Sequence, residues 1–286
     1  MELRQAHRKQ AKIKLALQGT SGSGKTMSAL LLASGITTWD KIAVVDTENH
    51  SADLYAHLGN YNVLQLSNPF TPERYIKAIE VCENAGMEVV IADSITHEWD
   101  GSGGILDLHG NMAGNSFTNW SKMTPRHNAF VQKILESDCH IISTIRTKSD
   151  YTLTDKNGKM VPEKVGLKGI QRDGIDFEFT IVFDLDIKHN ATASKDRTGL
   201  FMDKPEGIIT PEYGKRILKW CNEGTSLDEV IHQIRIATSV EKLREIYNSY
   251  PEYRTKIESL AIARKQEINA SIINQTKISG NGIETR

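Results

Sequence analysis

A glycine-rich turn, GTSGSGKT at residues 19–26, constrains the fold of this chain more than any other feature. The apolar run 13–18 precedes it, and an apolar stretch with helical spacing that includes Leu30 and Leu31 follows it. The spacing Gly-x-x-x-x-Gly-Lys-Ser/Thr between a strand and a helix is typical of a phosphate-binding loop, because glycines let backbone N–H groups surround a phosphate at the positive end of a helix. The turn therefore predicts a bound nucleoside triphosphate. The rival interpretation is a glycine-rich turn with an incidental lysine.

Each position of the turn has an expected role. We expect Lys25 to reach the outer phosphates and Thr26 to bind Mg²⁺ through its hydroxyl. The expected ligands are ATP and Mg²⁺. The residues of the turn expected to contact them are Gly19, Thr20, Ser21, Gly22, Ser23, Gly24, Lys25, Thr26 and Met27.

Two carboxylates farther along the chain complete the expected site. Asp93 ends the apolar run VVIADS, which we expect to be a neighbouring strand, and there an acidic residue can bind the metal ion through a water. Glu48 ends KIAVVDTE, where it can position and deprotonate the attacking water from an adjacent strand end. The alternatives are an aspartate that caps a turn and a solvated glutamate.

Apolar runs of strand length alternate with helical segments, which predicts an α/β fold with a mostly parallel sheet between helices. The expected strands lie at residues 13–18, 41–48, 88–94, 140–146, 177–187 and 198–204, and two of the helices at 72–86 and 211–220. Two long stretches, 98–126 and 148–174, are expected to be irregular insertions after strands. Compact domains rarely keep loops of that length unless the loops are functional or disordered.

The chain divides into four parts by its sequence pattern. Residues 1–12 form a basic N-terminal segment, and residues 13–222 form the expected nucleotide-binding core. Residues 225–270 show amphipathic helical spacing broken at Pro251, and the polar segment 271–286 is expected to be a flexible tail. The helical appendage can dock on a neighbouring subunit or a protein partner, or pack on its own core.

Composition excludes several classes of protein. The formal net charge is −1 at pH 7, so nucleic-acid binding requires a local basic patch. Three widely spaced cysteines, Cys82, Cys139 and Cys221, suggest neither a disulfide framework nor a zinc site and favour a reducing compartment. The charged N-terminus lacks a signal-peptide core, and no run approaches the roughly 18 apolar residues that a membrane span needs. We therefore expect a cytoplasmic protein without membrane contact.

The motifs resemble those of RecA-like ATPases. KIAVVDTENHSADLY, VVIADSITHEW and HIISTIRTKSDY follow the glycine-rich turn in the order of that family, and the resemblance spans about residues 12–220. It implies a RecA-like P-loop fold, ATP hydrolysis and Glu48 as the catalytic glutamate. In the recombinase branch, the loops after the next two strands contact single-stranded DNA. VGLKGIQRDGIDFEFT and HNATASKDRTGLF are similar to phage-encoded ATPases of the Sak type, which implies a role in annealing or recombination in the host cytoplasm.

The resemblance also implies residues that act between subunits. ASKDRTGLF, residues 193–201, is similar to the Lys-x-Arg-x-Gly signature of the RadA and DnaB branches, and by that analogy Lys195 and Arg197 reach a neighbour's ATP site. A guanidinium aimed at the γ-phosphate stabilises charge that develops in the transition state. Activity then requires a homo-oligomer, either a ring or a filament. The alternative is a solvent-facing charged turn.

One position departs from the pattern of the family. The recombinase branch has a glutamine that senses the γ-phosphate at the end of its fourth core strand, where this chain has Thr144 followed by Arg146. Threonine is shorter and lacks the amide. We therefore expect Thr144 at the nucleotide, and Thr144 or Arg146 in place of the sensor.

Basic residues gather in the second insertion. Between Arg146 and Arg172, seven basic residues accompany three acidic ones, and residues 1–14 carry a similar positive excess. The first insertion is not basic, although its Phe117 and Trp120 could stack on bases. A solvated lysine-rich loop is the alternative. The residues expected to contact DNA are Arg146, Lys148, Tyr151, Lys156, Lys159, Lys164, Lys168 and Arg172.

The preferred function is an ATP-hydrolysing oligomer that binds single-stranded DNA and is stimulated by it. Two other functions stay open. A regulatory ATP-binding switch would engage a protein partner through its long loops and C-terminal helices, and it would hydrolyse ATP slowly whether or not DNA is present. A helicase-like or packaging motor would move directionally along nucleic acid.

Overall fold

The computed structural model describes residues 11–156, 159–222 and 227–280, without the side chains of residues 149–167, 252 and 271–280. The chain forms two compact units, Lys12–Ile217 and Leu218–Arg286 with Met1–Ala11. The division falls within helix α6 (Pro211–Asn222). The basic segment expected at 1–12 lies almost entirely outside the described residues.

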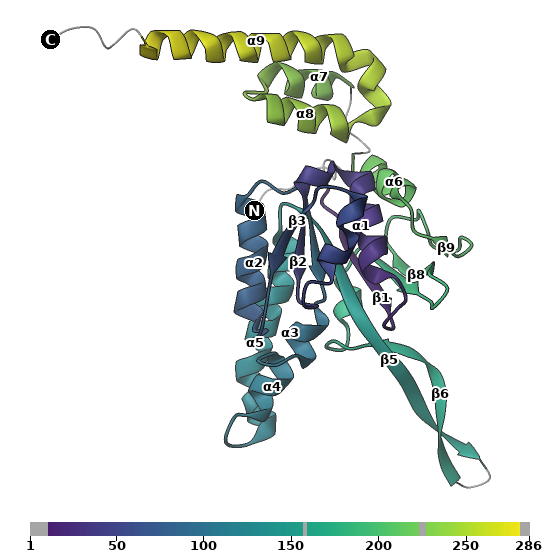
Figure 1. Cartoon of the computed structure of the whole chain (residues 1–286). Helices are drawn as coiled ribbons and strands as arrows, with labels where there is room; N and C mark the ends of the chain where they lie inside the picture. Colours follow the sequence, from purple (N-terminus) through teal and green to yellow (C-terminus); the bar gives the residue numbers. More distant parts are fainter. Residues whose placement is uncertain (1–10, 157–158, 223–226, 281–286) are drawn as a thin grey trace, which may run out of the picture. The chain divides into compact units, whose positions relative to one another are not determined.

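One sheet forms the centre of the larger unit (Figure 1). Its strand order is β3-β2-β4-β5-β1-β7-β8-β9, and β6 pairs with β5. Neighbours from β3 through β7 are parallel, whereas the β7–β8, β8–β9 and β5–β6 pairs are antiparallel. This confirms the predicted α/β fold with a mostly parallel sheet. The strands are β1 (Lys14–Gly19), β2 (Ile42–Asp46), β3 (Asn62–Gln65), β4 (Val89–Asp93), β5 (His140–Lys156), β6 (Lys159–Gly169), β7 (Ile181–Leu185), β8 (Asn190–Asp196) and β9 (Gly207–Ile208).

Helices cover both faces of the central parallel strands, which explains why β2 and β4 are buried along their whole length and apolar up to their terminal aspartates. Helices α2 (Pro72–Asn84) and α5 (Ser116–Glu136) pack on one face, where Tyr75 and Phe130 join a core with alternate residues of the sheet. Successive strand residues point to opposite faces of the sheet. On the other face, α1 (Lys25–Ile36) contacts β1, β4 and β5. The sheet is therefore buried between layers of helices.

Two glycines bring α1 and α6 into close contact. A Cβ atom on Gly35 would lie 1.9 Å from the carbonyl oxygen of Pro211, and one on Gly214 would lie 2.1 Å from that of Leu32. No side chain fits at either position, because protein interiors have no space to spare. Both glycines are therefore required by packing.

The first expected insertion, residues 98–126, is largely helical, so the prediction of an irregular stretch is wrong. It contains α3 (Thr96–Asp100), α4 (Ile105–Gly110) and the first half of α5. Glycines separate these helices, and Asn115 caps α5 by accepting a hydrogen bond from the N–H of Phe117 at 2.8 Å. Pro125 lies inside α5 and interrupts the helical sequence pattern.

The second expected insertion, residues 148–174, is also more regular than predicted. Strands β5 and β6 form a long antiparallel hairpin from Thr147↔Gly169 to Lys156↔Lys159 (Figure 1). The Asn-Gly pair at 157–158, between two stretches in which apolar and polar residues alternate, is a hairpin signal in the sequence. The strand predicted at 198–204 is wrong as well, because these residues form bends and turns. The antiparallel partner of β7 is instead β8, at 190–196.

The smaller unit confirms the amphipathic helices predicted after residue 225. Helices α7 (Leu227–Ile236), α8 (Val240–Ser249) and α9 (Arg254–Gly280) share a core that includes Val230, Leu243 and Ile257. Because α9 runs to Gly280, the first part of the segment expected as a tail is helical. Short 3₁₀ turns lie at Trp39–Lys41, Ala52–Leu58, Ile175–Phe177 and Pro251–Tyr253.

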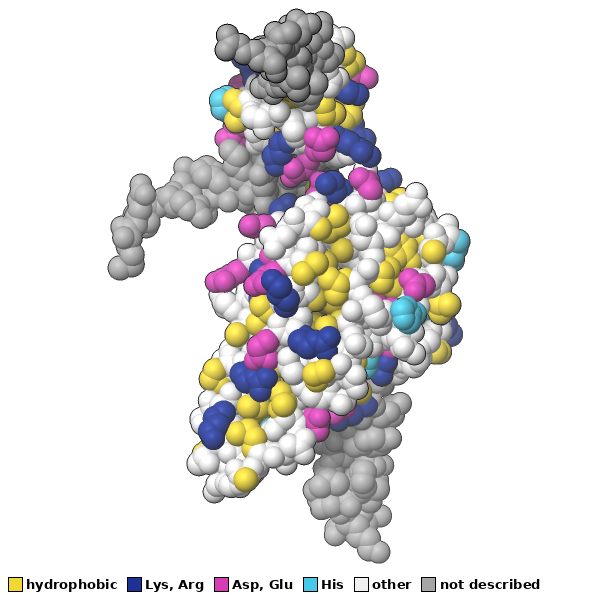
Figure 2. Space-filling model, turned by 60° about the vertical axis from the view of Figure 1, so that its left-hand side comes forward, with side chains coloured by type: hydrophobic (Ala, Val, Ile, Leu, Met, Phe, Trp, Pro, Cys, Tyr) yellow, Lys and Arg dark blue, Asp and Glu magenta, His cyan; other side chains and the backbone are white. Residues whose placement is uncertain are grey.

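Charges of both signs are mixed on the face shown in Figure 2, where neither basic nor acidic side chains cover a broad area. This agrees with the formal net charge of −1. None of the described helices has the length and apolar character needed to cross a lipid bilayer.

The close contact of α1 and α6 predicts a large effect of one methyl group. Gly214→Ala should lower the free energy of unfolding by ~1–3 kcal/mol, the usual range for overpacking. Gly110→Ala is the matched control, because a Cβ there would meet nothing within 4 Å. Urea denaturation of both variants checks this, and equal stability of the two would contradict it.

Candidate nucleotide-binding site

The glycine-rich turn joins β1 directly to α1. Gly22 and Gly24 have φ angles of +81° and +85°, in the left-handed region that side chains disfavour. A Cβ atom on Gly24 would also lie 3.0 Å from Nδ1 of His189. The turn therefore has the backbone that a phosphate-binding loop requires.

A cavity of about 580 Å³ opens beside this turn. Of the predicted nucleotide-binding residues, six line the cavity: Ser21, Gly22, Gly24, Lys25, Thr26 and Met27. Glu48, Asp93 and Arg146 line it too: Glu48 lies just after β2, Asp93 ends β4, and Arg146 lies within β5. The lining residues that sequence reasoning missed include Tyr55 and His189, which lie within the quoted motifs but received no role, and Ile208 and Ile209, which belong to no motif.

The remaining predicted contacts, Gly19, Thr20, Ser23 and Thr144, are not among the residues that line the cavity. Gly19 and Thr20 accept hydrogen bonds from Nζ of Lys25 at 3.0 and 2.8 Å through their carbonyl oxygens. Ser23 is buried and its hydroxyl has no hydrogen-bond partner among the described residues, while Thr144 is fully buried. Burial lowers the pKa of Lys25, although the nearby carboxylates Asp93 and Glu48 oppose this effect.

Asp93 holds two hydroxyl groups from different elements. One carboxylate oxygen accepts a hydrogen bond from Thr26 at 2.6 Å, and the other accepts one from Thr144. The prediction that Asp93 lies on a strand next to β1 is wrong, because β5 lies between β1 and β4. Thr144, on β5, fills the intervening position, and Thr26 reaches Asp93 from the start of α1. Burial raises the pKa of Asp93, while these two hydrogen bonds oppose the shift.

The oxygen donors of this site fit a magnesium ion. Mg²⁺ prefers oxygen ligands and usually binds one or two protein groups together with waters and substrate phosphates. Thr26 and Asp93 supply such groups at the edge of the cavity. In the described part of the chain, no cluster of three or more His, Cys, Asp or Glu residues forms an alternative metal site.

Glu48 forms an ion pair with Arg146. Nε of Arg146 donates to one oxygen of Glu48 at 2.8 Å, and a terminal nitrogen donates to the other. The hydroxyl of Ser94 adds a hydrogen bond at 3.1 Å. Burial raises the pKa of Glu48, but the Arg146 guanidinium outweighs burial and holds the pKa below its usual value. Glu48 is thus a charged carboxylate, and its ion pair with Arg146 makes it a weaker base.

The two residues predicted to act between subunits lie away from this cavity. Lys195 donates from Nζ to the carbonyl oxygen of Asp176 at 2.9 Å and also to that of Phe177. Arg197 donates to the Phe177 carbonyl oxygen at 3.0 Å. Neither residue lines the nucleotide cavity of its own chain.

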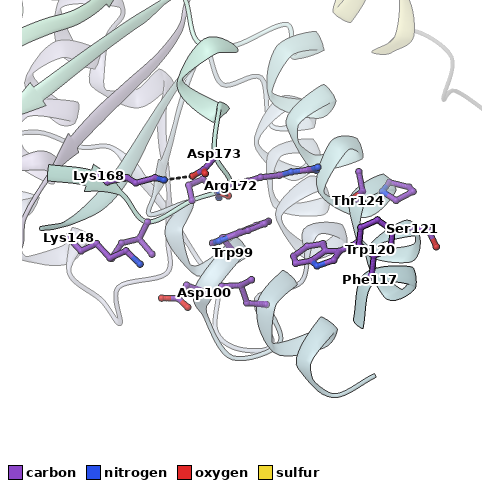
Figure 3. A pocket seen from close by; sticks show the side chains of 15 residues that line it. Trp99, Asp100, Phe117, Trp120, Ser121, Thr124, Lys148, Lys168, Arg172 and Asp173 are labelled. Carbon is purple, nitrogen blue, oxygen red and sulfur yellow. Dashed lines mark hydrogen bonds and ion pairs between the residues drawn. The ribbon is translucent and has the colours of Figure 1, made fainter. Parts of the chain in front are cut away.

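The predicted DNA-contacting residues separate into three groups. Arg146 lines the nucleotide cavity, whereas Lys148, Lys168 and Arg172 line a second cavity of about 990 Å³ (Figure 3). Lys148 and Lys168 are direct cross-strand partners at the base of the β5–β6 hairpin. The side chains of Tyr151, Lys156, Lys159 and Lys164 lie outside the described ones.

Comparison with known proteins agrees with the loop, the cavity and the sheet. A family model described as an AAA domain matches residues 11–221 of the chain. The chain belongs to this AAA-domain family. AAA-type P-loop ATPases bind nucleotide, so membership accounts for the phosphate-binding turn. No curated protein matches the sequence.

The position of Asp93 predicts a loss of metal affinity in Asp93→Asn. The amide keeps the shape of the side chain but removes the charge that would attract Mg²⁺. The Mg²⁺ concentration that half-saturates nucleotide binding should rise by about 10–100-fold, as for other groups that orient metal-bound waters. This concentration is measured by titrating Mg²⁺ into the protein mixed with a fluorescent ATP analogue. Asp138→Asn, an exposed aspartate outside the cavity, is the control. An unchanged Mg²⁺ requirement in Asp93→Asn would contradict the assignment.

Proposed function

We propose that the protein is an oligomeric ATPase that binds single-stranded DNA and serves annealing, recombination or replication of phage DNA. The observation that carries the proposal is the course of strand β5. Arg146 of β5 lines the nucleotide cavity, and Lys148, two residues farther along, lines the second cavity. A single strand therefore connects the nucleotide site to the base of a basic hairpin.

The two lysines at the base of the hairpin support binding of a polyanion. Lys148 and Lys168 lie directly opposite each other, where two like charges destabilise a sheet. Lys168 forms an ion pair with Asp173 at 2.8 Å, while no described residue forms an ion pair with Lys148. A phosphate backbone would relieve this repulsion and release its own counterions.

In the proposed site, Lys25 and Thr26 hold the phosphates and Mg²⁺ of ATP, together with Asp93. Glu48 positions and deprotonates the attacking water once its ion pair with Arg146 opens. Arg146 then takes the place of the missing sensor glutamine, since a γ-phosphate competes with Glu48 for the guanidinium. The sequence similarity to Sak-type phage ATPases supports the setting in DNA recombination.

DNA-dependent hydrolysis tests the proposal most directly. Single-stranded DNA should raise the ATPase rate, and the effect should fade as salt rises, because salt competes with lysine–phosphate contacts. The double variant Lys156→Ala/Lys159→Ala should make the slope of log affinity against log salt concentration less steep by roughly 0.7 for each lost phosphate contact. Lys77→Ala on α2, an exposed lysine outside both cavities, is the control.

The result also separates the other functions. A rate that DNA leaves unchanged at low salt, together with no retained DNA complex, would overturn the proposal and favour a switch that engages a protein partner. Directional movement along DNA would favour a motor.

Mixing two inactive variants tests the action of Lys195 and Arg197 between subunits. Lys25→Ala removes ATP binding from its own subunit, and Lys195→Ala/Arg197→Ala leaves that site intact. If these residues act in a neighbour's site, a mixture of the two variants should recover ATPase activity that neither has alone. The absence of recovery in mixtures that co-assemble on a sizing column would refute this role.

A further inference from the structure

The second cavity, called the aromatic cavity below, lies between the α3–α5 region and the base of the hairpin (Figure 3). Figure 3 shows Trp99 near its centre, with Trp120 and Phe117 on α5 and with lysines from the hairpin on the other side. Its volume of about 990 Å³ is larger than that of the nucleotide cavity. The family match accounts for the nucleotide site but gives this cavity no role.

Aromatic rings form a continuous series along one wall of the aromatic cavity. The rings of Trp99 and Trp120 are stacked with centroids 5.9 Å apart, and His109 stacks on Trp120 at 4.2 Å. Phe117, in the first turn of α5, is 86% exposed. A phenylalanine this exposed contributes little to the core, but its ring is available to stack on a planar ligand.

Basic side chains lie on the opposite wall. They are Lys148 and Lys168 on the hairpin, and Arg172 just after it. Arg172 donates to the amide oxygen of Asn128 at 3.3 Å, and no described carboxylate forms an ion pair with it. The acidic residues of the cavity are Asp100 and Asp173, of which Asp173 pairs with Lys168. The cavity thus keeps a positive excess beside its rings.

Buried polar contacts fix the aromatic wall in place. Glu98, beside Trp99 on α3, is fully buried and lies 3.1 Å from Nδ1 of His127 on α5. Gln171 donates to the same carboxylate at 3.2 Å, and the Trp99 ring meets the edge of His127 at 5.3 Å. These contacts join α3, α5 and the segment after β6. A site held this rigidly loses little entropy when a ligand binds.

We propose that the aromatic cavity binds single-stranded nucleic acid, with a base stacked on the exposed ring of Phe117 beside the Trp99 and Trp120 rings, and with phosphates held by Lys148 and Arg172. This rests on the proposed function and adds that bases and phosphates lie on opposite walls of one cavity. Stacking requires bases that are free of a partner strand, so duplex DNA does not fit this mode. Because stacking accepts every base, binding depends little on sequence.

Stacking and charge contacts respond differently to salt, which gives a sharp test. Phe117→Ala should weaken binding of oligo-dT by about 5- to 100-fold, the range for losing one stacked base, without changing the slope against salt. Lys148→Ala should instead lower that slope by roughly 0.7. Val81→Ala, an exposed apolar residue on α2, and Lys77→Ala are the matched controls. Thermal melting checks the fold of each variant.

Tryptophan fluorescence gives a second readout that does not depend on affinity. Trp99 and Trp120 line the cavity, whereas Trp39 does not, so saturating oligo-dT should quench the wild-type emission. Trp120→Phe should lose much of this quenching, and Trp39→Phe should keep it. Parallel titrations with oligo-rU and with duplex DNA show whether RNA binds and whether paired bases are excluded.

The possible failures are distinguishable. Full affinity in both Phe117→Ala and Trp120→Phe, with no quenching of the wild type, would overturn the aromatic cavity while leaving DNA binding by the hairpin intact. Tighter binding of duplex than of single strands would also overturn it. If the wild-type protein binds no oligonucleotide at low salt, the proposed function itself fails, and this inference fails with it.

Discussion

The carboxylate of Asp93 is the constraint on which the nucleotide site depends. It is almost fully buried and accepts hydrogen bonds from Thr26 at the start of α1 and Thr144 in the middle of the sheet. Burial of a charged group is costly unless it is hydrogen-bonded, so the two hydroxyl groups stabilise the buried carboxylate. The same contacts fix the phosphate-binding turn against β4 and β5. The site is therefore a property of the sheet as well as of the turn.

Helix α3 extends this arrangement away from the nucleotide. It follows β4 directly, and Thr96 on α3 accepts a hydrogen bond from the N–H of Arg146 at 2.9 Å. His97, the next residue of α3, places its Nδ1 atom 2.8 Å from the hydroxyl of Thr47, and Thr47 precedes Glu48 in the sequence. Trp99 on the same helix lines the aromatic cavity. The five-residue helix α3 therefore contacts residues next to the Glu48–Arg146 pair and also contributes Trp99 to the second cavity.

The predicted position of the glycine-rich turn between a strand and a helix is confirmed, whereas the prediction that the two insertions are irregular is wrong. The phosphate-binding turn depends on local backbone geometry, so glycine spacing is enough to identify it. In the first insertion, Pro125 within α5 interrupts the helical pattern, although packing of Phe130 on Tyr75 stabilises the helix. In the second, the hairpin continues β5 beyond the core. Helix α5 is stabilised by a neighbour distant in sequence, which local patterns do not contain, whereas the hairpin pairs nearby residues around an Asn-Gly turn that the sequence does contain.

By itself, the sequence determined the α/β class, the nucleotide-binding turn and the presence of Glu48 and Asp93 at strand ends, because these follow from local periodicity and spacing. Only the tertiary structure decided that β5 lies between β1 and β4, that Arg146 pairs with Glu48, and that the aromatic rings of α3 and α5 face the lysines of the hairpin. Strand order and side-chain pairing depend on how distant segments pack, and no local pattern specifies that packing.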